Sequence, residues 1–139
     1  MAQPGESRTV RDIVFDTDIL VWYLRGEDRA RRFIESVPYS ERAISSLTMM
    51  ELLKGCRKAA EIRAVRAFLT HNVSSLIHPD ENISQRAIGL LESHAATHGL
   101  RVVDALIAAT ALESGSALAT GNLRHYRAIT TLHVVPFRP

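Results

Sequence analysis

Residues 13–20 read Ile13-Val14-Phe15-Asp16-Thr17-Asp18-Ile19-Leu20, so a short apolar run leads directly into a carboxylate. The β-branched and aromatic residues of this run favour a buried strand. The apolar residues 19–24 then favour a helix that packs back onto the strand. In an open α/β sheet, ligands bind beyond the carboxyl ends of the strands, where Asp16 would lie. A charge there costs free energy unless it is paired or bound to a cation.

Strands and helices alternate along the rest of the chain. Further strands are predicted at 42–45, 73–78, 117–120 and 132–135, and helices at 27–36, 47–55, 61–71, 83–98 and 105–112. This alternation favours an α/β sandwich around a mostly parallel sheet. The 139 residues contain no internal repeat or linker, which predicts a single domain over 12–139 after a mobile lead-in at 1–11.

The composition is that of a soluble globular protein, with 46% hydrophobic and 23% charged residues. The single cysteine, Cys56, excludes an internal disulfide framework and a cysteine-based zinc site, and it suits a cytoplasmic setting. No apolar run approaches the roughly 20 residues of a membrane span. Arginine makes up 15 of the 17 basic residues, which suits phosphate contacts but also follows from biased codon usage.

Three carboxylates stand inside apolar sequence. Asp16 follows a strand, Glu51 lies within Met49-Met50-Glu51-Leu52-Leu53, and Asp104 precedes an alanine-rich helix. Asn122 follows the predicted strand at 117–120 and offers another oxygen. Clustered carboxylates repel one another, and a divalent cation removes that penalty. Oxygen ligands select magnesium or manganese over zinc.

Each of these residues also has a purely structural explanation. Glu51 could close a capping box with Thr48, because the pattern Thr-x-x-Glu fits. Asp104 could be the N-cap of its helix. Asp16 could pair with an arginine, and Asn122 could be a turn residue. All four at strand ends and helix starts together favour a common site.

The same residues carry a resemblance to the PIN-domain ribonucleases, specifically to the VapC toxins of bacterial toxin–antitoxin pairs. The similar segments are Val14–Thr17, Ser45–Gly55, Val103–Ala111, Thr120–Tyr126, Ile129 and Val134–Phe137. The resemblance extends over nearly the whole chain from about residue 12. Its most specific parts are the Asp-Ala-Leu-Ile-Ala-Ala helix and the Thr-x-Asn-x-x-His segment.

The resemblance implies a three-layer α/β/α fold with a mostly parallel four- to five-stranded sheet. It also implies an acidic pocket that binds Mg²⁺ or Mn²⁺ and cleaves RNA. The first three family acids correspond to Asp16, Glu51 and Asp104, and the fourth position, aspartate or asparagine, corresponds to Asn122. Thr120 matches a polar residue that lines the pocket.

Chemistry and resemblance together suggest a mechanism. Asp16 and Asp104 would hold one ion, and Glu51 would position or activate a water that attacks phosphorus in line. A second ion, recruited with the RNA, would stabilise the leaving oxygen. Arg101, Arg124 and His125 could contact phosphates, although exposed surface positions explain them equally well.

Two positions depart from the family pattern. Tyr126 replaces the usual phenylalanine after the histidine, and we expect this change to have little effect. Asp18 stands where many members carry a small polar residue. It could add a carboxylate close to the site, but a first-turn or N-cap acid of the following helix is the preferred interpretation.

Three other functions compete with the nuclease. Asp16-Thr17-Asp18 is similar to the Asp-x-Asp of haloacid-dehalogenase-type phosphatases, which need a downstream lysine and a later acidic pair. A receiver-type signalling module shares the acidic pocket but also needs a lysine after its last strands. The only lysines are Lys54 and Lys58. The third alternative is a PIN-like protein that binds RNA without cleaving it.

The resemblance also implies partners besides RNA. A cognate antitoxin would block the acidic pocket with its C-terminal segment. A homodimer, or a larger toxin–antitoxin assembly, would form through helices that include the apolar runs Trp22–Leu24 and Leu47–Leu53. Family members cut transfer, ribosomal or messenger RNA, and no pattern in the chain selects among them.

Overall fold

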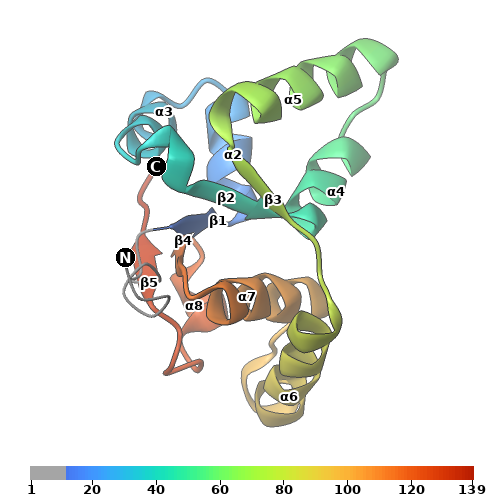
Figure 1. Cartoon of the computed structure of the whole chain (residues 1–139), viewed down its shortest axis with the longest axis vertical. Helices are drawn as coiled ribbons and strands as arrows, with labels where there is room; N and C mark the ends of the chain where they lie inside the picture. Colours follow the sequence, from blue (N-terminus) through green and yellow to red (C-terminus); the bar gives the residue numbers. More distant parts are fainter. Residues whose placement is uncertain (1–11) are drawn as a thin grey trace, which may run out of the picture.

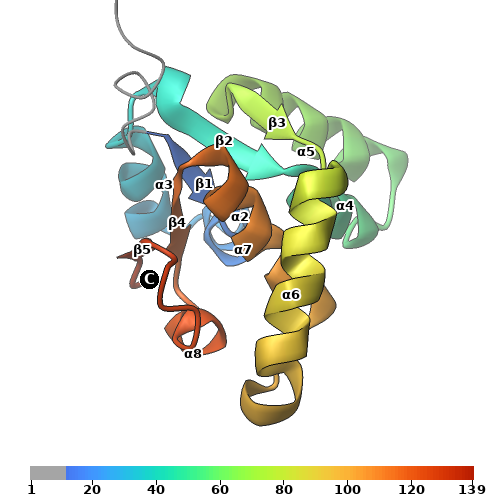
Figure 2. The same cartoon turned by 60° about the horizontal axis from the view of Figure 1, so that its bottom comes forward.

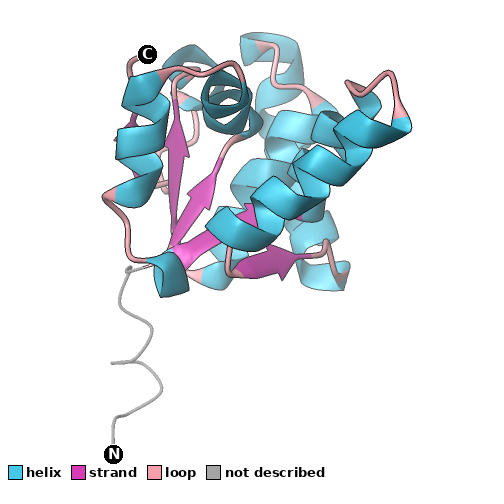
Figure 3. Cartoon of the chain, turned by 90° about the horizontal axis from the view of Figure 1, so that it is seen from above, coloured by secondary structure: helices cyan, strands magenta, loops and turns pink. Residues whose placement is uncertain are grey.

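The computed structural model describes residues 12–139 and has a five-stranded sheet at its centre. The strands are β1 (Ile13–Phe15), β2 (Arg42–Ser45), β3 (Ser75–Ile77), β4 (Ala117–Thr120) and β5 (Val134–Pro136). Their order is β3-β2-β1-β4-β5, and every neighbouring pair is parallel. Figure 3 shows the strands fanning out in one twisted sheet. The parallel sheet of the prediction is confirmed, and the lead-in predicted at 1–11 lies outside the described residues.

Helices cover both faces of the sheet (Figure 1). One layer contains α2 (Thr17–Leu24), α3 (Asp28–Glu35), α4 (Ser46–Lys54) and α5 (Ala59–Asn72), and a 3-10 turn at Tyr39–Glu41 leads into β2. The opposite layer contains α6 (Glu81–His98), α7 (Val102–Ser114) and α8 (Leu123–Tyr126). Each layer packs on its own hydrophobic core, so the three-layer α/β/α class is confirmed. Within the described residues, no helix is long and apolar enough to cross a membrane.

The first strand is buried on both faces of the sheet. Val14 and Phe15 have no solvent exposure and point into different cores, one under α7 and one under α2. This alternation follows from the two-residue period of a strand, and it explains why the run 13–15 is apolar on both faces.

The strand order reverses between β1 and β4, and Phe15 is in register with Ala119. The carboxyl ends of these two strands therefore lie side by side, with Asp16 after one and Thr120 at the end of the other. Open α/β sheets bind ligands at such a reversal. The order also differs from the 2-1-3-4-5 order of receiver-like sheets.

Most predicted helix ends shift by one or two residues, and two larger differences concern α7 and α8. The buried, alanine-rich α7 begins at Val102 rather than 105, because Arg101 is its N-cap residue. Asp104 is therefore in the first turn of α7, and the alternative that it caps this helix is wrong. The sequence pattern does not predict α8, because four residues are too few to show a helical period.

Candidate active site

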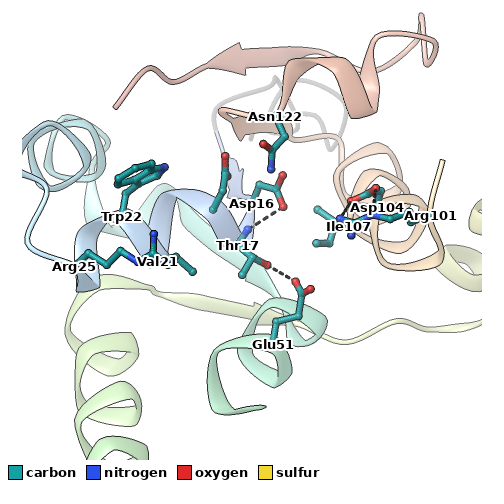
Figure 4. Close-up of a pocket in the computed structure, with 11 residues that line it drawn as sticks. Asp16, Thr17, Val21, Trp22, Arg25, Glu51, Arg101, Asp104, Ile107 and Asn122 are labelled. Carbon is teal, nitrogen blue, oxygen red and sulfur yellow. Dashed lines mark hydrogen bonds and ion pairs between the residues drawn. The ribbon is translucent and has the colours of Figure 1, made fainter. Parts of the chain in front are cut away.

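A pocket of about 300 Å³ opens at the carboxyl ends of β1 and β4 (Figure 4). Its polar lining comes from α2, α4, α7 and the turn after β4: Asp16, Thr17, Asp18, Arg25, Glu51, Arg101, Asp104 and Asn122. The structure thus brings together the four residues of the predicted site, which lie up to 106 positions apart in the chain. We call this the acidic pocket.

Asp16 is held by neutral hydrogen-bond donors. Its Oδ1 accepts from the backbone N–H of Thr17 at 2.8 Å, and its Oδ2 accepts from the hydroxyls of Thr120 at 2.8 Å and Tyr126 at 3.0 Å. Burial raises the pKa of the Asp16 carboxyl above its ordinary value, and the three hydrogen bonds oppose that rise. Among residues 12–139, no arginine pairs with Asp16, so the structure gives no support to that structural alternative.

The hydroxyl of Tyr126 links the two buried aspartates. It lies 3.0 Å from Asp16 Oδ2 and 3.5 Å from Asp104 Oδ1, on a side chain that is 1% exposed. Burial and the neighbouring carboxylates raise the pKa of the Tyr126 hydroxyl, so it stays a neutral donor. The sequence suggested that tyrosine at this place matters little, whereas phenylalanine could not make either contact.

Asp104 is held by a cation instead. The guanidinium of Arg101 donates from Nε to Oδ2 at 3.1 Å and from Nη2 to Oδ1 at 3.3 Å. The ring Nδ1 of His125 lies 3.5 Å from Oδ2. Asp104 is buried, whereas the Arg101 side chain is 67% exposed. Of the three predicted phosphate contacts, Arg101 and His125 therefore lie beside Asp104, while Arg124 is exposed outside the acidic pocket.

Glu51 reaches the pocket from the other side (Figure 4). Its Oε1 accepts from the hydroxyl of Thr17 at 2.6 Å, and the hydroxyls of Thr17 and Thr48 are hydrogen-bonded at 3.0 Å. Ser45 caps α4 by accepting from the N–H of Leu47, so Thr48 and Glu51 form no capping box. That structural alternative is wrong, and the carboxylate of Glu51 is directed at the pocket.

Asp18 contributes more to the pocket than the sequence indicated. It is a first-turn acid of α2, as expected, but its Oδ2 also accepts from the N–H of Gly121 at 2.8 Å. Its Oδ1 is buried without a hydrogen-bond partner among the described residues. Burial, and then the charge of Asp16, raise the pKa of the Asp18 carboxyl to about 6. A Cβ at Gly121 would lie 2.8 Å from Asp18 Oδ2, so a larger residue there would displace the Asp18 carboxylate.

Thr120 and Asn122 complete the edge after β4. Thr120 is fully buried, and its hydroxyl accepts from the N–H of Asn122 at 2.9 Å while donating to Asp16. Asn122 precedes α8 but makes no side-chain cap, and Figure 4 shows its amide beside Asp16. Asn122 is therefore a turn residue and also lines the acidic pocket.

The profile of the PIN domain matches residues 13–129. The chain belongs to the PIN-domain family. This match extends over all the residues of the acidic pocket. The division into a lead-in at 1–11 and one domain at 12–139 stays a prediction.

Curated relatives of this PIN domain carry the name of a nuclease. It is 36% identical to Ribonuclease VapC19 of Mycobacterium tuberculosis over 81% of this chain and 90% of that protein. It is 32% identical to Ribonuclease VapC10 of the same species over 82% of this chain and 85% of that protein.

Solved structures share the fold. A toxin–antitoxin complex from Klebsiella pneumoniae matches with a TM-score of 0.76 and 29% identity, over 89% of this chain and 96% of that chain. VapBC-1 from nontypeable Haemophilus influenzae matches with a TM-score of 0.72 and 25% identity over the same shares. The chain has no lysine after Lys58, where a phosphatase or receiver of these classes needs one. This absence and the PIN assignment together set aside the phosphatase and receiver interpretations.

The acidic pocket of this PIN domain offers a small set of oxygen ligands. Within residues 12–139, no three His, Cys, Asp or Glu side chains are placed to hold one metal ion together. Mg²⁺ in proteins is commonly bound through one or two carboxylates and keeps several waters. Asp16 and Asp104, joined through Tyr126, fit that pattern, and the unpartnered Oδ1 of Asp18 adds an acceptor nearby.

Proposed function

We propose that this protein is a metal-dependent endoribonuclease and the toxin of a toxin–antitoxin pair. The observation that carries the proposal is the pair Asp16 and Asp104, both buried, linked by the Tyr126 hydroxyl and facing Glu51 across the acidic pocket of a PIN domain. The names of the curated relatives support RNA as the substrate.

Asp16 and Asp104 would hold Mg²⁺ or Mn²⁺. Such an ion supplies a Lewis acid that lowers the pKa of water and neutralises charge on the displaced oxygen. The hydroxyls of Thr120 and Tyr126 fix the Asp16 carboxylate in place before any ligand arrives. This preorganisation avoids the cost of ordering the side chain during the reaction.

Glu51 is the residue placed to act on the attacking water. Thr17 orients its carboxylate through a single hydrogen bond, and the side chain remains accessible from the pocket. Glu51 would accept a proton as the water oxygen bonds to phosphorus and the bond from phosphorus to the leaving oxygen breaks. Arg101, 67% exposed beside Asp104, would contact the substrate phosphate.

RNA cleavage by purified protein tests this proposal. With Mg²⁺ or Mn²⁺ the wild type should cut RNA, and EDTA should stop the reaction. Asp16→Ala and Asp104→Ala should each lose at least about 100-fold in rate, since even residues that only orient metal ligands cost 10–100-fold. Glu92→Ala, an exposed acid on α6, is the matched control and should cut normally.

Two results would overturn the proposal. Activity that survives both aspartate substitutions would remove the acidic pocket from the reaction. RNA binding by the wild type without cleavage would favour the non-catalytic PIN-like alternative. Mapping the cut sites across total cellular RNA would then identify the target class.

We also propose that a cognate antitoxin covers the acidic pocket with its C-terminal segment. The similar solved structures are toxin–antitoxin complexes. A cleft of about 600 Å³ between α2, α4 and α5 is lined by apolar residues such as Leu24 and Val65. It shares Val21, Arg25 and Glu51 with the acidic pocket, so one peptide could follow both.

Co-expression with the antitoxin tests this part. The antitoxin should co-purify with the protein and inhibit RNA cleavage. Leu24→Lys, at the 42% exposed rim of the cleft, should weaken the complex while RNA cleavage persists. We further propose a homodimer, and a monomer in sedimentation experiments at micromolar concentration would contradict it.

A further inference from the structure

A second pocket borders the acidic pocket and has the opposite charge. It has a volume of about 540 Å³ and is lined by His98, Gly99, Arg124, His125, Arg127 and Ala128. Figure 2 shows the two elements that form it, the end of α6 and the short α8, at the same end of the molecule. Four of the six lining residues can carry positive charge and none is acidic.

His125 connects the two pockets. Its side chain lines the basic pocket, and its ring Nδ1 lies 3.5 Å from Asp104 Oδ2. Asp104 in turn lines the acidic pocket. A polymer whose phosphate reaches Asp104 therefore has its neighbouring backbone beside His125.

The arginines of this pocket are available to a ligand. Arg124 and Arg127 are exposed, and neither forms an ion pair within residues 12–139. Arg31, Arg32 and Arg86, by contrast, are all paired with carboxylates elsewhere on the surface. Unpaired guanidinium groups are suited to bidentate contact with phosphate oxygens.

The histidines offer one ring nitrogen each. Nδ1 of His98 lies 2.8 Å from the hydroxyl of Thr97, and Nδ1 of His125 faces Asp104. This leaves Nε2 of both rings as the nitrogen that a ligand can use. The pocket volume lies within the ~300–1,000 Å³ range of small-ligand sites, enough for a nucleotide unit.

We propose that this basic pocket binds the backbone of single-stranded RNA next to the phosphate that is cut. Arg124 and Arg127 contact its phosphates, and His98 and His125 form the walls. The physical reason is that the carboxylates of the acidic pocket repel a polyanion, so cations beside them must hold the strand. The inference rests on the proposed function and specifies where its substrate runs.

RNA binding without cleavage tests the basic pocket. The background is Asp16→Asn, which should not cut, and the probe is a fluorescein-labelled single-stranded RNA measured by anisotropy at several salt concentrations. Adding Arg124→Gln and Arg127→Gln should weaken binding about tenfold. The slope of log K against log [salt] should fall by about 1.4, since each single-strand phosphate contact contributes ~0.7.

The matched control is Arg63→Gln with Arg66→Gln. These arginines are also exposed and form no ion pair in the described part of the chain, but they lie on α5, far from α8 in Figure 1. The control should keep the affinity and the salt slope of the background within about twofold. In otherwise wild-type protein, the Arg124/Arg127 double variant should raise KM and leave kcat nearly unchanged.

The outcomes separate this inference from the proposed function. If the wild type neither cuts nor binds RNA, the proposed function fails. If the wild type cuts RNA but the Arg124/Arg127 variant matches the Arg63/Arg66 control in affinity and salt slope, the basic pocket is not the RNA site. Should the double variant melt at a lower temperature than the control, Arg124→Lys with Arg127→Lys preserves charge. This lysine variant should keep most of the slope of log K against log [salt] while it binds RNA less tightly.

Discussion

Asp16 and Asp104 share one hydroxyl donor, yet the protein holds them in different ways. Asp16 is surrounded by neutral donors from β4, α8 and its own helix start, all fixed by the fold. Asp104 is held by Arg101, a side chain that is mostly in solvent. The first carboxylate is therefore positioned permanently, whereas the second has a partner that can leave when a ligand arrives.

The difference has an electrostatic consequence. Neutral hydrogen bonds stabilise the ionised Asp16 only in part, and its pKa remains raised by burial. The guanidinium beside Asp104 places a positive charge where a metal ion would otherwise be needed. The protein itself therefore supplies a substitute cation, Arg101, but only on the Asp104 side of the acidic pocket.

Tyr126→Phe should have the largest effect, because it removes the donor that both carboxylates share. Loss of a hydrogen bond to a charged group costs about 1.5–3 kcal/mol of stability. RNA cleavage should fall about 10–100-fold, as for other residues that orient metal ligands. Urea denaturation and cleavage rates measure the two effects. Tyr39→Phe, which removes an exposed hydroxyl bound to the Thr70 carbonyl, is the control. Equal effects of the two variants would contradict the linking role of Tyr126.

Asp18→Asn should stabilise the metal-free protein at neutral pH. The pKa of this carboxyl rises from 3.8 to about 6 on folding, so the folded state binds more protons between these values. Stability therefore falls as pH rises through this window and stays lower above it. Asparagine removes the penalty and still accepts from Gly121. The gain should be about 1–2 kcal/mol at pH 8, after allowance for solvent screening, and should vanish below pH 4.

Urea denaturation in EDTA across pH 3.5–8 measures this gain. Asp28→Asn is the control of opposite sign, because Arg31 lowers the pKa of that exposed carboxyl. A gain for Asp18→Asn that is the same at every pH would show that the Asp18 carboxyl does not titrate as described.

Arg101→Gln should have the smallest effect, since an exposed ion pair contributes little. Without the Arg101 guanidinium, a metal ion that binds Asp104 no longer has to displace a cation from it. Mn²⁺ should bind about two- to fivefold more tightly, which corresponds to the ~0.5–1 kcal/mol of such a pair. Titration calorimetry measures the affinity independently of RNA cleavage. Arg124→Gln, outside the acidic pocket, should leave it unchanged, and weaker Mn²⁺ binding by Arg101→Gln would contradict the substitute-cation role.

The sequence by itself determined the alternation of strands and helices and the position of Asp16 at a strand end. These features follow from local patterns: a continuous apolar run in β1, a helical period in α6, and polar residues next to apolar runs. It also predicted that Glu51, Asp104 and Asn122 lie in one site with Asp16, because each interrupts or follows an apolar segment whose own structure is predictable.

Only the tertiary structure decided how these residues contact one another. The hydroxyl of Tyr126 reaches Asp16 across 110 positions of the chain, and the N–H of Gly121 reaches Asp18 across 103. The basic pocket likewise requires the end of α6 and the unpredicted α8 to lie together. These contacts form because β1 lies beside β4 in the sheet, an order that depends on the packing of both cores. No local sequence pattern contains that information.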